Sequence, residues 1–175
     1  MNLSGALSLI RQIPDYPKPG ILFQDITPML SNAQAFKTVL SEMAQHSASA
    51  EVIAGIEARG FIFGSALAAH TGKSFVPIRK SGKLPYQTFS AKYGLEYGTD
   101  EVEVHIDAFT PKQKVLIVDD VLATGGTLLA AIELSERCGA EVAAVLVLIE
   151  LAALEGRKTI TGKFPDIEII SLVKI

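Results

Sequence analysis

The sequence predicts an α/β fold with a central, mainly parallel sheet. Short apolar runs rich in Val and Ile alternate along the chain with stretches whose apolar residues have helical spacing. The clearest run, Val115–Val118, is apolar throughout, as is typical of a strand buried on both faces of a parallel sheet. Two acids, Asp119 and Asp120, follow it, and a small-residue segment then leads into a helical stretch over 128–138. This strand–loop–helix order occurs more than once, which indicates a parallel sheet.

Composition limits the classes of function. The chain has 175 residues, 49% of them hydrophobic and 20% charged, so it can bury the core of one domain. A net charge of −3 argues against a general nucleic-acid binder, which would carry an excess of basic residues. We find no apolar run long enough for a membrane span and no signal pattern. Cys138 is the only cysteine, and the three histidines lack zinc-ligand spacing. We expect a soluble, cytoplasmic protein.

The first part of the chain mixes helical and extended patterns. Apolar residues at positions 3, 6, 7 and 10 predict a helix over the first dozen residues, which the prolines between 14 and 19 end. Residues 21–28 predict a short strand or loop. Ser31 or Asn32 can cap a helix whose apolar stripe is formed by positions 36, 39, 40 and 43.

A second strand–loop–helix unit follows. Residues 51–56 predict a strand, and residues 61–70 predict a helix that Gly72 ends. Between them, Arg59 either forms an ion pair with Glu57 or contacts a pyrophosphate. After a strand over 75–78, residues 81–99 are neither helical nor alternating. A stretch of this length is usually functional, often a lid, and the alternative is a disordered surface insertion. Further strands are expected over 101–106, 141–149 and 168–173, with a short helix over 151–155.

The segment after the central strand carries the clearest chemistry. Asp119 and Asp120 offer acceptors for a sugar diol, and Ala123–Thr127 offers backbone N–H groups and hydroxyls at a helix start, which suit a phosphate. A P-loop would need Lys where Gly126 stands, and a dinucleotide fingerprint would place its acid after the glycines. An ordinary turn with a capping Thr leaves the second acid and the double glycine unexplained. The pattern therefore predicts a ribose 5-phosphate site.

Several motifs together carry a family resemblance. VLIVDDVLATGGT at 115–127 resembles the motif that binds 5-phosphoribosyl 1-diphosphate (PRPP) in type I phosphoribosyltransferases. DYPKPGILFQDITP at 15–28, EARGFIFG at 57–64, RKSGKLP at 79–85 and LEYG at 95–98 make the chain similar to the adenine phosphoribosyltransferase family, most clearly over 13–149. The resemblance implies the type I fold, one domain over 1–175, conversion of adenine and PRPP to AMP and diphosphate in purine salvage, Mg²⁺ as cofactor and a homodimer.

The resemblance also assigns roles to residues. The pyrophosphate would be bound by Ala58, Arg59, Arg79, Lys80 and Lys83, and the ribose hydroxyls by Asp119 and Asp120. The 5′-phosphate would be bound by Ala123, Thr124, Gly125, Gly126 and Thr127. The expected catalytic residues are Glu96, Arg59 and Lys83, with Glu96 as the acid–base group at the purine nitrogen. No side chain is assigned as a direct metal ligand, because PRPP would carry most of the Mg²⁺ near the two aspartates.

Two segments complete this expectation. Residues 81–99 would form a lid that excludes water from the reacting sugar, with Tyr97 beside Glu96. Residues 1–34 would form an N-terminal hood in which Leu22, Phe23 and Gln24 bind adenine through the backbone and a stacked ring. The family commonly has Arg where this chain has Gln24, so a charged side-chain contact is not expected there.

Three points stay open at the level of sequence. Adjacent strand residues point to opposite faces, so one of Asp119 and Asp120 is expected to be structural, but the sequence does not say which. A phosphoribosyltransferase for another purine, such as xanthine, is the nearest alternative enzyme. A regulator that binds PRPP and nucleic acid is a non-enzymatic alternative, but it would need a DNA-binding domain or a basic face.

Overall fold

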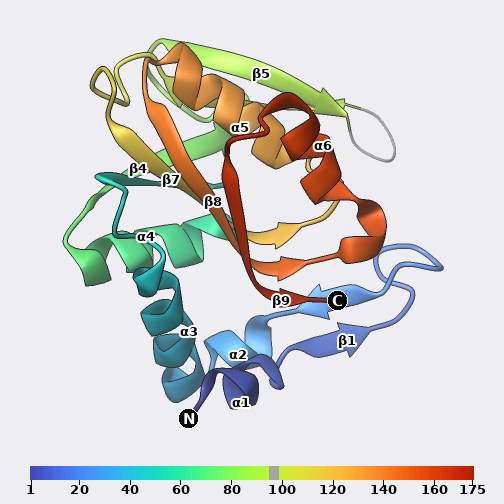
Figure 1. Ribbon diagram of the computed structural model, residues 1–175. Coiled ribbons are helices and arrows are strands. Elements are labelled where there is room, and N and C mark those ends of the chain that lie inside the picture. Colours follow the sequence, from blue (N-terminus) through green and yellow to red (C-terminus); the bar gives the residue numbers. More distant parts are fainter. Residues whose placement is uncertain (95–98) are drawn as a thin grey trace. The chain divides into compact units, whose positions relative to one another are not determined.

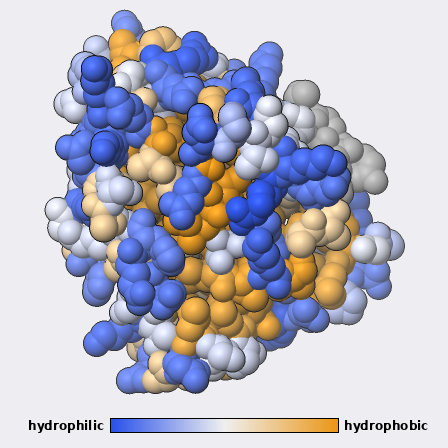
Figure 2. All heavy atoms as spheres, viewed as in Figure 1, coloured by the Kyte–Doolittle hydropathy of each residue, from blue (hydrophilic) through white to orange (hydrophobic). Residues whose placement is uncertain are grey.

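The chain folds into two compact units, Met1–Gln45 and His46–Ile175. The structure is a computed structural model that describes residues 1–94 and 99–175 (Figure 1). The predicted division into one domain with a hood and a lid stays a prediction. Hydrophilic and apolar side chains both reach the face drawn in Figure 2, as on most folded proteins. No helix in the described part of the chain combines the length and apolarity needed to cross a bilayer.

The first unit contains three helices and a two-stranded antiparallel sheet. Its elements are α1 (Leu3–Leu7), β1 (Arg11–Ile13), β2 (Phe23–Asp25), α2 (Thr27–Leu30) and α3 (Ala33–Gln45). The prediction of a helix over the first dozen residues was wrong beyond Leu7. Residues 11–13 form a strand instead, because they pair with β2 and Arg11 forms an ion pair with Asp25 at 2.6 Å. The capping prediction for α3 is confirmed, since the Asn32 side chain accepts the Ala35 N–H at 3.0 Å.

The second unit is built on a seven-stranded sheet with the order β5-β6-β4-β3-β7-β8-β9. Its strands are β3 (Val52–Ile56), β4 (Ser74–Lys80), β5 (Thr88–Gly94), β6 (Thr99–His105), β7 (Lys114–Leu122), β8 (Glu141–Glu150) and β9 (Glu168–Lys174). The five strands from β4 to β9 in this order are parallel to one another, and the β5–β6 hairpin is antiparallel. The predicted α/β fold with a mainly parallel sheet is confirmed.

The helices of this unit cover both faces of the sheet. They are α4 (Gly60–Thr71), α5 (Gly126–Arg137), the 3₁₀ turn η1 (Ala152–Leu154) and α6 (Gly156–Lys163). The chain moves from β3 through α4 to β4 in one direction along the sheet, and from β7 through α5 to β8 in the other. Because parallel crossovers are right-handed, α4 and α5 lie on opposite faces (Figure 1). The strand order therefore reverses between β3 and β7, and ligands of open α/β sheets bind at such a point.

Two sequence interpretations of this unit need correction. Asp119 and Asp120 lie inside β7 and not beyond its end, since pairing with β8 continues to Leu122. The stretch over 81–99 is not irregular throughout, because Thr88–Gly94 forms β5. Phe89 and Ala91 pack against the core and Tyr93 is buried, so apolar residues do alternate here. A short strand at the sheet edge gave too few alternations to stand out from its glycine-rich surroundings.

Candidate active site

The segments that follow β3 and β7 meet at one edge of the sheet. These strands are hydrogen-bonded neighbours, with Gly55 paired to Val118 near their carboxyl ends. Glu57, Ala58 and Arg59 follow β3, and the two acids of β7 come directly after Val118. The peptide bond between Glu57 and Ala58 is cis. Sheet order thus brings the predicted pyrophosphate residues of one motif next to the predicted ribose residues of another.

Arg59 connects these two motifs. Its Nη2 lies 2.9 Å from Oδ2 of Asp120, whose side chain is 4% exposed. Asp119 is more accessible than Asp120, and its Oδ1 accepts the Asp120 N–H at 2.8 Å. Glu57, the acid nearest to Arg59 in the sequence, forms ion pairs with Arg79 and Lys83 instead. Asp120 therefore anchors Arg59, and Asp119 is the acid left more open to a ligand.

Both aspartates are held in an environment that disfavours charge. Burial, reinforced by the neighbouring Asp120 carboxylate, raises the pKa of Asp119 well above its usual value. Burial also raises the pKa of Asp120, although the Arg59 guanidinium opposes this rise. Gly60 packs directly on the pair: a Cβ there would lie 2.8 Å from the Val118 carbonyl oxygen and 2.9 Å from Oδ1 of Asp119. Raised pKa values of this kind are frequent at functional sites.

The predicted phosphate loop bends between β7 and α5. Ala123, Thr124 and Gly125 form the bend, and α5 begins at Gly126 without a side-chain cap. The first N–H groups of the helix are therefore available to an anion. Gly125 has φ +88°, which only glycine adopts readily, and a Cβ there would lie 2.6 Å from the Gly156 carbonyl oxygen. Thr124 and Gly126 line a cavity of ≈ 340 Å³ together with residues of β5 and α6.

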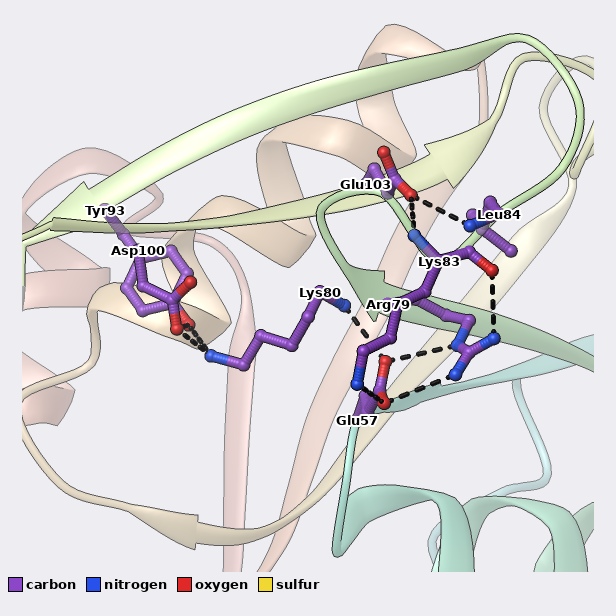
Figure 3. A network of polar contacts seen from close by, with 8 residues as sticks. All are labelled: Glu57, Arg79, Lys80, Lys83, Leu84, Tyr93, Asp100 and Glu103. Atoms are coloured by element: carbon purple, nitrogen blue, oxygen red, sulfur yellow. Dashed lines mark hydrogen bonds and ion pairs between the residues drawn. The ribbon is translucent and has the colours of Figure 1, made fainter.

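A cluster of cations surrounds Glu57 (Figure 3). Its carboxylate accepts hydrogen bonds from Arg79 Nε at 3.1 Å, from Lys83 Nζ at 2.8 Å and from the Lys80 backbone N–H at 3.1 Å. Burial alone would raise the pKa of Glu57, but these bonds, led by that from Lys83, lower it to about 2. Glu57 therefore stays ionised and fixes two predicted pyrophosphate residues, Arg79 and Lys83.

Glu103 of β6 holds the segment that carries Lys83. Its side chain is buried, and Oε1 accepts the backbone N–H groups of Lys83 and Leu84, each at 3.0 Å. Arg79 adds a bond from Nη1 to the Lys83 carbonyl oxygen at 3.0 Å. The loop after β4 is thus fastened to the neighbouring strand β6, as Figure 3 shows.

The Lys80 side chain leaves this cluster. Figure 3 shows it extending away from Glu57 toward the β5–β6 hairpin, where it meets Tyr93 and Asp100. The structure therefore groups Arg79 and Lys83 around one carboxylate, pairs Arg59 with a second, and places the Lys80 ammonium beside a third.

The remaining predicted residues fall in other parts of the chain. Leu22, Phe23 and Gln24 lie in the first unit, where Leu22 is exposed, Gln24 is buried and the Phe23 ring makes an edge contact with Tyr16 at 5.1 Å. Glu96 and Tyr97 lie outside the described residues. Sequence reasoning assigned no role to Tyr93, Asp100, Glu103 or Gly156. The first three lie near assigned motifs in the sequence, whereas Gly156 is far from any of them.

A family model for the phosphoribosyl transferase domain matches residues 27–173. The match covers most of the chain. The chain belongs to the phosphoribosyltransferase family.

Similar proteins within that family include adenine phosphoribosyltransferases. The chain is 53% identical to that of Symbiobacterium thermophilum, over 95% of this chain and 97% of the relative. The crystal structure of the enzyme from Thermoanaerobacter pseudethanolicus is 48% identical, with a TM-score of 0.93 over 99% of this chain and 100% of that chain. The enzyme from Saccharomyces cerevisiae, solved with adenine and an imino-altritol bisphosphate, is 36% identical, with a TM-score of 0.90 over 97% of this chain and 99% of that chain.

Proposed function

We propose that this protein transfers the 5-phosphoribosyl group of PRPP to adenine, giving AMP and diphosphate in purine salvage. One observation carries the proposal. Asp119, the uncapped start of α5 and the cations around Glu57 lie in or just beyond the carboxyl-terminal parts of three adjacent strands, β7, β3 and β4. A ribose that carries a 5′-phosphate and a 1-diphosphate presents its hydroxyls and its two anionic groups to such an arrangement.

The charges of the site match those that the reaction develops. Breaking the bond from the anomeric carbon to the diphosphate builds positive charge on the sugar and negative charge on the leaving group. Arg59, Arg79 and Lys83 would stabilise the leaving diphosphate, because preorganised cations favour charge that develops in the transition state. Asp119 would bind the ribose hydroxyls and stabilise the positive sugar, while Ala58 and the residues Ala123–Thr127 bind the diphosphate and 5′-phosphate through the backbone.

The donor set is compatible with Mg²⁺ that arrives with PRPP. In the described part of the chain, no three His, Cys, Asp or Glu side chains gather as a protein-only metal site would require. Mg²⁺ commonly binds through one or two carboxylates plus substrate phosphates and water, which Asp119 could supply. When bound, the ion would neutralise charge on the diphosphate.

Adenine recognition is assigned to the first unit and to the segment that contains Glu96. Leu22 and Phe23 would present backbone groups and a ring to the base, in line with the adenine bound by the relative from Saccharomyces cerevisiae. The Gln24 side chain, with Nε2 3.4 Å from the Leu22 carbonyl oxygen, would support this backbone. Glu96 would exchange the proton at the purine nitrogen, with Tyr97 beside it and residues 81–99 closing over the sugar.

The proposal is tested by offering PRPP and Mg²⁺ with adenine, hypoxanthine, guanine or xanthine in separate reactions. AMP and diphosphate should form in equal amounts with adenine and far faster than any product forms with the other bases. Faster turnover of another base would identify that base as the substrate in place of adenine. Absence of transfer to every base would overturn the enzymatic assignment. We further propose a cytoplasmic homodimer, which sedimentation of the purified protein and fractionation of its host would check.

A further inference from the structure

Two side chains from neighbouring strands of the hairpin meet the Lys80 ammonium. Lys80 ends β4, Tyr93 lies near the end of β5 and Asp100 near the start of β6. Lys80 Nζ donates to the Tyr93 hydroxyl at 2.6 Å and forms an ion pair with the Asp100 carboxylate. The Tyr93 hydroxyl in turn donates to Oδ2 of Asp100 at 3.0 Å, and the ammonium lies 5.3 Å from the centre of the Tyr93 ring. The three groups form a closed set of charge-assisted contacts.

The same residue belongs to the Glu57 cluster through its backbone. The Lys80 N–H donates to Glu57, while its side chain points to the hairpin on the other side (Figure 3). Arg79 and Lys83, which precede and follow it, both direct their charges to Glu57. The lysine side chain is long and flexible, so its ammonium can turn to another anion, but only if it leaves Asp100.

This ion pair can be exchanged. The side chains of Lys80 and Asp100 are 35% and 34% exposed, whereas Asp120, the partner of Arg59, is 4% exposed. A partly exposed pair contributes little free energy, because water solvates both charges when they separate. A diphosphate carries more negative charge than one carboxylate and can therefore compete for the ammonium.

We propose that Tyr93 and Asp100 are positioning residues that hold Lys80 away from the diphosphate position and so weaken diphosphate binding. The proposal rests on the proposed function, in which Lys80 is a diphosphate ligand. Asp100 and the incoming diphosphate compete for one ammonium, and the return of Lys80 to Asp100 favours release of the product. Removing Asp100 should therefore tighten binding, which is opposite to the effect expected of a supporting structural residue.

The test is titration of the full-length protein with inorganic pyrophosphate and Mg²⁺ by calorimetry. Asp100→Asn should bind about three- to fivefold more tightly than the parent, the range that a partly exposed ion pair allows. Lys80→Gln should bind more weakly, and the double variant should match Lys80→Gln. Glu141→Gln removes the same charge from an exposed position at the opposite end of the parallel strands and controls for net charge.

Each outcome decides the proposal. Equal or weaker binding by Asp100→Asn, or a gain no larger than that of Glu141→Gln, overturns it, as does a double variant as tight as Asp100→Asn. Should Asp100→Asn fail to fold, Tyr93→Phe removes the 2.6 Å contact and should tighten binding by a smaller factor, and unchanged binding overturns the proposal. AMP synthesis by the parent is measured separately. Loss of that activity with the predicted pyrophosphate affinities would refute the proposed function alone.

Discussion

Replacing Glu57 with Gln should destabilise the protein at neutral pH and have a much smaller effect in acid. The carboxylate is 11% exposed and accepts bonds from Arg79, Lys83 and the Lys80 N–H. Gln keeps the shape and one acceptor but removes the charge that these donors surround. The two cations would then lie near a neutral amide, and a loss of charge-assisted bonds of this kind reduces stability.

The size of this stability loss and its dependence on pH follow from the pKa of Glu57. Folding lowers the pKa of Glu57 from 4.5 to about 2, which would correspond to about 3 kcal/mol of stability. Because Arg79 and Lys83 are 32% and 50% exposed, solvent screening reduces this to about 2 kcal/mol. The folded pKa lies below the unfolded one, so this stability is fully present above pH 4.5 and is lost as the pH falls toward 2. Less than half of it should remain at about pH 3.

Urea unfolding at neutral pH and at about pH 3 measures both quantities. The free energy of unfolding of Glu57→Gln should lie about 2 kcal/mol below that of the parent at pH 7, and about 1 kcal/mol or less below it at pH 3. Glu141→Gln removes the same charge from an exposed position, and its free energy of unfolding should differ little from that of the parent at both pH values. A gap between Glu57→Gln and the parent that is equal at both pH values would refute the assignment of Glu57 as the ionised centre of the cluster.

Three further changes test the proposed roles. Asp119→Asn should weaken PRPP binding by about one to two decades. It should nevertheless raise the melting temperature, because folding raises the pKa of Asp119 and the protein therefore loses stability as the pH rises through that folded pKa. A lower melting temperature of the variant in calorimetry would contradict this expectation. Gly125→Ala should raise the KM for PRPP roughly tenfold, because its φ is +88° and its Cβ would meet Gly156; Gly162→Ala, with open space around it, is the control and should keep the parent's KM. Glu96→Gln should lower saturated single-turnover rates by about 10²–10⁴ if it moves the purine proton, and rates equal to the parent's would end that assignment.

The sheet was predictable because its central strands have strong local signals. Val115–Val118 and the run over 141–149 are apolar at nearly every position and rich in Val and Ile, and β7 and β8 contain them. Helix α6 gave no such signal. Its sequence, GRKTITGK, contains two glycines and two threonines, and only Gly156 and Ile160 are buried. Contact with α5, and not a local pattern, accounts for this helix.

The candidate site was predictable in its parts but not in its pairings. Each motif could be read locally, because its glycines, acids and cations come directly after an apolar run. Which acid meets which cation depends on the order of strands in the sheet. Glu57 was the nearest acid to Arg59 along the chain, but β7 lies beside β3 and supplies Asp120 instead. In the same way, β4 places Arg79 next to Glu57, and the pairing of β4 with β6 places Asp100 next to Lys80.

All four charged side chains assigned to the diphosphate are paired with carboxylates: Arg59 with Asp120, Arg79 and Lys83 with Glu57, and Lys80 with Asp100. The pairs differ in how readily they can exchange. Asp120 and Glu57 are largely buried, and separating a buried carboxylate from its partner is costly. The two arginines, with rigid planar groups, should therefore stay in place when PRPP binds. The two lysines are more flexible, and Lys83 is half exposed. We expect the arginines to determine where the diphosphate lies and the lysines to determine how tightly it is held.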